Sequence, residues 1–160
     1  MKKSLYGILA LLVICFSFVA CDDDDNNDSR THSELPEIVL EGTYNGNYEV
    51  YNADGVTHEN TYSASVVITK GENPYSFYLE SICSEAKLNG KEQKALNAAW
   101  ANDDIKFYGP TTAGTTSGYL NPAALNGIYS EGTISFRFSK TVREGRKTVT
   151  NFYNFVGTKQ

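Results

Sequence analysis

From Leu40 onward, apolar and polar residues alternate along the chain with a period of two. The first such segment runs to Tyr51 and places its apolar residues on one face: Leu40, Tyr44, Tyr48 and Val50. The opposite face is polar: Glu41, Thr43, Asn45, Asn47 and Glu49. A two-residue period is typical of a half-buried antiparallel strand.

The segments that follow repeat this pattern. Asn52–Gly55 predicts a turn with a glycine at the position that needs a positive φ. The chain then returns through a second alternating set: Tyr62, Ala64, Val66 and Ile68. A turn over 70–74 and a third strand over Tyr75–Ile82 complete a predicted meander.

The middle of the chain is less regular. Residues 90–103 lack β-branched side chains and place Leu96 and Trp100 four apart, which favours a short helix over one end of the sheet. A short strand is expected over 104–108, a loop over 109–118 and a tight helical turn over 121–127.

Strands return at the C-terminal end. Ile134, Phe136 and Phe138 share one face, a turn is expected at 144–145, and 147–159 carries large side chains on both faces, so its inward set stays open. Together these elements predict a mostly β fold: an antiparallel up-and-down β-barrel of about eight strands with one short helix. A β-sandwich is the alternative.

The N-terminal segment has the features of an export signal. A cationic start, Met1-Lys2-Lys3, precedes Leu5–Ala20, which holds no charged residue. This run is shorter than the about 20 apolar residues of a comfortable membrane span and fits a secretory signal peptide. An ordinary cleaved signal peptide, followed by Cys21 only by chance, is the alternative to the lipoprotein signal described next.

Phe18-Val19-Ala20-Cys21 resembles the bacterial lipobox. The resemblance implies a lipoprotein-type signal peptide over 1–20 and a first mature residue, Cys21, that carries lipid. Stable membrane attachment needs two or more acyl chains. A diacylglyceryl group on the Cys21 sulfur and an acylated amine would meet that need.

An acidic run follows the cysteine directly: Asp22, Asp23, Asp24 and Asp25. Such a segment cannot bury surface, which predicts a disordered tether over 21–36 before a β-barrel domain over 37–160. The run also resembles the surface-export signal of outer-membrane lipoproteins in a group of Gram-negative bacteria. It therefore implies outer-membrane anchoring with exposure at the cell surface; a plain spacer and a periplasm-facing protein are the alternatives.

Charge and chemistry narrow the function classes. Without Lys2 and Lys3 the chain has 12 basic and 19 acidic residues, a net charge of −7 that argues against nucleic acid. Cys83 is left without a disulfide partner and is expected to be a small buried hydrophobe; a nucleophile with His58 as its base is the alternative. No catalytic, cofactor or metal motif is recognisable, so the chain is expected not to be an enzyme and to need no cofactor.

A second resemblance concerns the domain. "LEGTYNGNYEV" and "SEGTISFRFSKTV" resemble calycin-like, lipocalin-type β-barrels of bacterial lipoproteins, with Gly42-Thr43-Tyr44 in place of the Gly-x-Trp whose tryptophan plugs the barrel base. The chain holds 11 Tyr, 8 Phe and 1 Trp, which either fill a small barrel or line a ligand cavity.

Four of these aromatic residues are the candidates for contacting a small apolar or sugar ligand: Tyr44, Tyr48, Trp100 and Phe136. The expected function is non-catalytic small-ligand binding. The alternative is a protein–protein or glycan-binding accessory module of a surface uptake or adhesion complex, with another envelope protein as partner.

Overall fold

The structure, a computed structural model, describes residues 32–91, 95–109 and 123–160. The expected signal peptide, Cys21 and the aspartate run lie outside the described residues, as does most of the expected 109–118 loop. Among the helices of the described part, none is long and apolar enough to cross a membrane.

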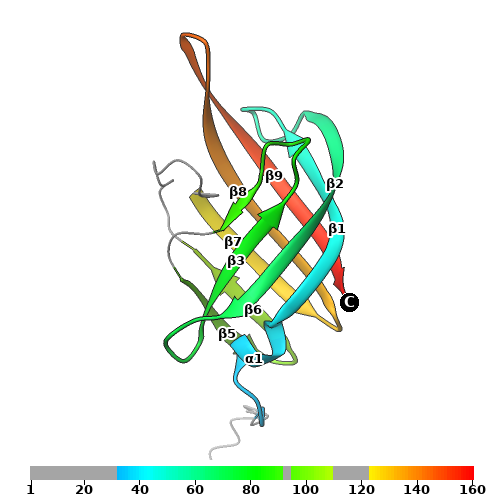
Figure 1. Cartoon of the computed structure of the whole chain (residues 1–160), viewed down its shortest axis with the longest axis vertical. Coiled ribbons are helices and arrows are strands. Elements are labelled where there is room, and N and C mark those ends of the chain that lie inside the picture. The colour runs from blue at the N-terminus through cyan, green and yellow to red at the C-terminus, as the bar shows by residue number, and fades with distance from the viewer. Residues whose placement is uncertain (1–31, 92–94, 110–122) are drawn as a thin grey trace, which may run out of the picture.

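The described residues form one short helix and nine strands (Figure 1). Their bounds are α1 Pro36–Leu40, β1 Gly42–Tyr51, β2 His58–Lys70, β3 Ser76–Ile82, β4 Gly90–Lys91, β5 Leu96–Ala101, β6 Asp104–Tyr108, β7 Ala123–Ser130, β8 Thr133–Glu144 and β9 Lys147–Lys159. All belong to a single sheet except α1.

Eight of the strands close into a ring. The hydrogen-bonded order is β2-β1-β9-β8-β7-β6-β5-β3, and β2 also pairs with β3, so the first and last members meet. Every neighbouring pair in the ring is antiparallel. This barrel-like ring confirms the predicted up-and-down arrangement of about eight strands and not the two-sheet alternative.

The alternating residues fill the ring as the sequence pattern predicts. Tyr44, Tyr48 and Val50 are buried, as are Ile134, Phe136 and Phe138. Leu40 is buried too, but it is the last residue of α1 and does not belong to the first strand, where the alternation placed it. For β9 the structure supplies the missing assignment, with Tyr153 and Phe155 buried and Val156 exposed. At the turn between β1 and β2, Gly55 has a φ of 70°, so the predicted positive φ is confirmed.

The predicted helix over 90–103 is wrong for the described residues of that range, 90–91 and 95–103. The described residues there form β4 and β5, in which Leu96 and Ala98 are buried and Trp100 packs against the core. A spacing of four residues is also two repeats of the strand period, so Leu96 and Trp100 fit either element. Pairing with β3 and β6 decides for the strand.

The expected helical turn over 121–127 is also wrong for its described part. Residues from Ala123 onward belong to β7, and the register with β8 shifts between Ala123 and Asn126. Ala124 there has a φ of 51°. This β-bulge breaks the alternation locally, which is why the segment does not look like a strand in the sequence.

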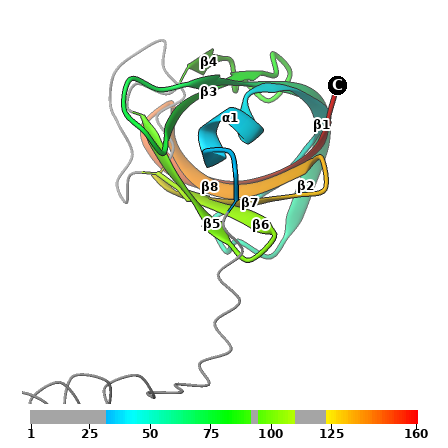
Figure 2. The same ribbon diagram turned by 90° about the horizontal axis from the view of Figure 1, so that it is seen from below.

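The helix of the fold lies instead at Pro36–Leu40, at the start of the domain. Proline at its first turn suits a helix start, because its missing N–H would have no intrahelical partner. Viewed from below, α1 sits within the ring and occupies this end, which we call the base (Figure 2).

Candidate functional site

Three of the four predicted ligand-contacting residues lie in the filled interior. Tyr44 and Tyr48 have no exposed surface, and Phe136 is 2% exposed. The Tyr48 ring lies 5.0 Å from that of Phe155 and 6.2 Å from that of Phe136, centroid to centroid. The middle of the ring is therefore packed with aromatic side chains, and these residues meet one another there.

Tyr44 closes the lower part of this core. Its hydroxyl donates a 2.7 Å hydrogen bond to the Leu40 carbonyl oxygen, and its ring meets Tyr129 edge-on at 6.3 Å. Tyr48 higher in the ring donates to Ser81 Oγ at 3.0 Å. Burial raises the pKa of both phenols well above its usual range, so both stay neutral donors.

Trp100 is placed apart from the other three, at the base. Its ring stacks on His32 at 3.6 Å, and its indole N–H donates to the Glu34 carbonyl oxygen at 3.0 Å. Lys159 Nζ also donates to the Val39 carbonyl at 2.8 Å. These contacts attach the segment around α1 to the ring and seal the base.

The opposite end of the ring, the mouth, holds a cavity of about 290 Å³. Its lining comes from five segments: Val50, Glu59, Tyr62, Glu85, Ala86, Lys87, Lys140, Arg143, Asn151 and Tyr153. Val50 and Tyr153 are buried, whereas Glu59, Lys87 and Arg143 are exposed. The mouth cavity thus has an apolar floor and a charged rim.

Lys140 is the residue of this cavity that the sequence reasoning missed. It is half-buried, and burial lowers the pKa of its ammonium group. No hydrogen bond or ion pair to Lys140 is found among the described residues. The signal was available in the alternation, since Lys140 continues the inward set of Phe136 and Phe138 along β8.

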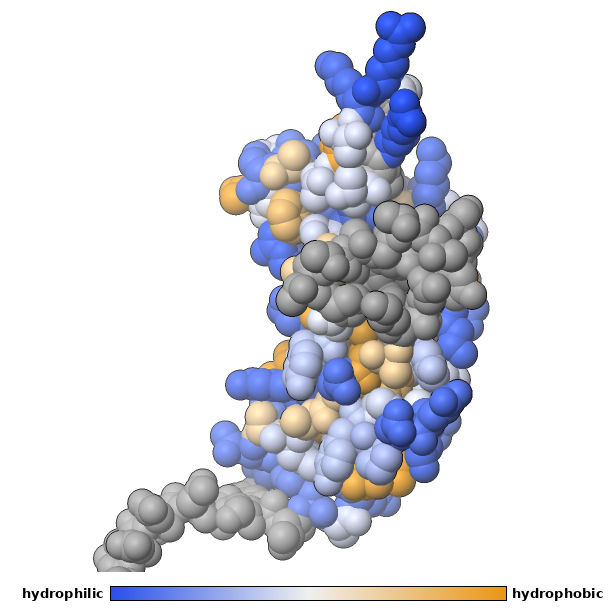
Figure 3. Space-filling view, turned by 90° about the vertical axis from the view of Figure 1, so that its left-hand side faces the viewer, coloured by the Kyte–Doolittle hydropathy of each residue, from blue (hydrophilic) through white to orange (hydrophobic). Residues whose placement is uncertain are grey.

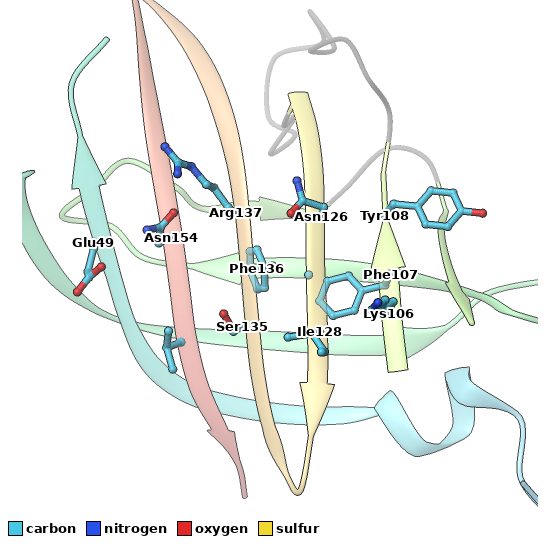
Figure 4. Close-up of a pocket in the computed structure, with 12 residues that line it drawn as sticks. Glu49, Lys106, Phe107, Tyr108, Asn126, Ile128, Ser135, Phe136, Arg137 and Asn154 are labelled. Carbon is cyan, nitrogen blue, oxygen red and sulfur yellow. The ribbon is translucent and has the colours of Figure 1, made fainter. Parts of the chain in front are cut away.

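A second and larger hollow lies on the outer face of the ring (Figure 4). This outer cleft measures about 630 Å³ and crosses β1, β9, β8, β7 and β6. Its lining residues are Glu49, Lys106, Phe107, Tyr108, Asn126, Gly127, Ile128, Ser135, Phe136, Arg137, Asn154 and Val156. In a side view the molecule is hollowed along one side, below the hydrophilic tip of the β8–β9 hairpin (Figure 3).

The close packing beneath the floor of the outer cleft explains why residue 127 is a glycine. A Cβ atom there would meet the Phe107 ring and, at 2.6 Å, Phe136 Cβ. Only glycine lets β7 approach these two core rings so closely. Phe136, predicted as a ligand contact from inside, therefore also lies directly beneath the outer cleft.

Cys83 and His58, the alternative pair of nucleophile and base, have different contact partners. Cys83 is buried, as expected, and its sulfur faces the Ser63 carbonyl at 3.6 Å. His58 lies exposed at the start of β2 and contacts Thr61 Oγ1 at 3.0 Å. Within the described ranges no three His, Cys, Asp or Glu side chains are grouped to hold a metal ion.

Comparison of the chain with protein-family models, with curated proteins and with solved structures gave no match.

Proposed function

We propose that this chain is a lipid-anchored cell-envelope lipoprotein whose barrel-like domain binds a small ligand, without transforming it, in the mouth cavity. The observation that carries the binding proposal is Lys140, a half-buried cation without a partner among the described residues, in a cavity with an apolar floor. Cavities of this kind, apolar with a few placed polar groups, are the usual form of ligand sites.

The lining defines the chemistry of the ligand. Val50, Tyr62 and Tyr153 offer an apolar surface at the bottom of the mouth cavity, and Lys140 offers one ammonium group. A carboxylate or phosphate would restore to Lys140 the interactions that burial removes. The proposed ligand is a small molecule with an apolar body and one acidic group.

The experiment is native mass spectrometry of the full chain purified from its own host, to detect a small molecule that remains bound. We expect Lys140→Met to lose it, because methionine keeps an unbranched side chain but removes the charge. Lys70→Met is the matched control, since Lys70 is an exposed strand lysine that lines neither the mouth cavity nor the outer cleft. A bound mass retained by Lys140→Met would reject the mouth as the site.

The anchoring proposal rests on the lipobox-like stretch that ends at Cys21 and on the acidic run behind it. Cys21→Ala is expected to leave an uncut precursor or a released form that takes up no labelled palmitate. Palmitate incorporation by that variant would refute the lipid assignment.

The outer-membrane, surface-exposed location is tested separately. Replacing Asp22 to Asp25 by alanine is expected to abolish cleavage of the protein by protease added to intact cells, at unchanged total protein. Unchanged cleavage would leave the aspartates as a plain spacer, and a wild-type chain that is never cleaved would favour the periplasm-facing alternative.

A further inference from the structure

The outer cleft is built from two rows of side chains that cross the strands. In the first row each residue is the direct cross-strand partner of the next: Glu49, Asn154, Arg137, Asn126 and Tyr108. All five belong to the outward-facing set of their strands and line the cleft. Figure 4 shows them side by side across the five strands. We call this the polar row.

The second row is parallel to the first, two residues along each strand. It consists of Val156, Ser135, Ile128 and Lys106, again in direct cross-strand pairing. Val156 is 52% exposed, and in the polar row Tyr108 is 57% exposed. The cleft therefore has hydrogen-bonding groups along one side, an exposed aromatic ring at one end, and along the other side two aliphatic side chains, a serine and a lysine.

The dimensions of the cleft suit a chain and not a compact molecule. Neighbouring strands lie about 4.8 Å apart, so a row across five strands is about 19 Å long. The polar groups are spread along this length, at one per strand, and do not converge on one point.

We propose that the outer cleft binds a neutral oligosaccharide chain. The sugar hydroxyls lie along the polar row, whose carboxylate, amides and guanidinium both donate and accept hydrogen bonds. The C–H faces of the sugar rings rest on Val156 and Ile128, and a terminal ring stacks on Tyr108. This site is separate from the mouth cavity and does not depend on it.

Other ligand classes fit less well. At the polar row each of the five strands is paired on both sides, so no free strand edge is offered to a peptide backbone. Glu49 is negative, whereas Arg137 and Lys106 are positive, so a ligand of one charge sign would meet repulsion within the cleft. Hydroxyl groups, which carry no charge, match all these side chains.

One detail of the polar row supports a ligand with hydroxyl groups. Arg137 is held in place by a 2.9 Å hydrogen bond from Nη2 to the Gly55 carbonyl and by the Phe152 ring. Its remaining N–H groups are thereby oriented in advance for a ligand.

The test is calorimetric titration of the full chain with neutral hexasaccharides of glucose, xylose, mannose and N-acetylglucosamine in defined linkages. We expect at least one to bind, and Tyr108→Ala and Asn126→Ala each to weaken its affinity about tenfold or more. Tyr108→Phe should retain most of the affinity, because the ring still stacks. Circular dichroism of each variant checks that it is folded.

Matched controls come from the turn before β3, away from the outer cleft. Tyr75 is 52% exposed and Asn73 is exposed, so Tyr75→Ala and Asn73→Ala remove the same groups elsewhere and should bind as the wild type does. No binding of any hexasaccharide at millimolar concentration would overturn the proposal. Binding that is lost in Lys140→Met and kept in the polar-row variants would overturn it too, by moving the site to the mouth.

Discussion

The base and the mouth of the ring are finished in different ways, although the same alternating strands build both. At the base, α1 enters the ring and Tyr44 donates to a carbonyl of α1, while Lys159 and Trp100 hold the adjoining segment. At the mouth, Lys140 of β8 and Asn151 of β9 line a cavity that remains open.

The difference shows what closes a small ring of strands. The inward aromatic residues fill its middle at any height, but an end is sealed only where another element covers it and satisfies its polar groups. The base has α1 for this purpose. The mouth has charged side chains, which keep it hydrated and accessible to a ligand.

The largest expected effect tests the seal at the base. Tyr44→Ala removes a fully buried ring and should cost about 3 to 5 kcal/mol of unfolding free energy, because a cavity is left behind. The outward neighbour Thr43 is only half-buried, so Thr43→Ala should cost no more than about 0.5 kcal/mol. Urea midpoints of the two variants give the ranking, and equal losses would mean that Tyr44 is no plug.

At Glu37 in α1, a substitution is expected to increase the stability of the base. Its side chain is fully buried at the base, and neither carboxylate oxygen has a hydrogen-bond partner among the described residues. Glu37→Leu should therefore stabilise the fold by about 1 to 3 kcal/mol. The exposed Glu41, just after the helix, is the control, and Glu41→Leu should leave the urea midpoint nearly unchanged. A loss of stability in Glu37→Leu would show that the base needs this carboxylate.

Tyr48, between the two ends, gives a prediction on pH. Burial raises the pKa of its phenol above 10.0, the value of an exposed tyrosine, so the unfolded chain loses the proton first as pH rises. The stability that neutral Tyr48 contributes is complete below about pH 10 and is lost above it.

Tyr48→Phe should cost about 1 kcal/mol at neutral pH, through the lost hydrogen bond to Ser81. Between about pH 10 and pH 12, the unfolding free energy of Tyr48→Phe should also fall less than that of the wild type. Urea melts of both proteins across this range measure the difference. Parallel curves would mean that the Tyr48 hydroxyl is reached by water.

The smallest expected change concerns stability at the mouth. Lys140 is half-buried, has no counter-ion among the described residues and is partly solvated, so Lys140→Met should alter the unfolding free energy by at most about 0.5 kcal/mol. Thermal melts without ligand check this. A large loss in Lys140→Met would show that the mouth is held by this residue and is not a free site.

The alternation of apolar and polar residues was enough to predict the fold class and most of the inward residues. Alternation is a local property, because successive side chains of a strand point to opposite faces wherever its partner lies. The inward positions of β1, β2 and β8 could therefore be read directly, and Lys140 could have been found by extending the same count. Where the period was ambiguous, as at Leu96 and Trp100, or interrupted by a bulge, as at Ala124, the local pattern predicted the wrong element.

The residues that meet across the ring could not be predicted in this way, because they depend on how the strands pair. The polar row joins Glu49, Tyr108, Asn126, Arg137 and Asn154, which lie far apart in the chain and come together through the register of four strand pairs. A register shift of one residue would turn a whole side-chain set to the other face, so these neighbours depend on pairings that no local segment specifies. The placement of α1 inside the base is of the same kind, because a five-residue helix is stable only against the core that it covers.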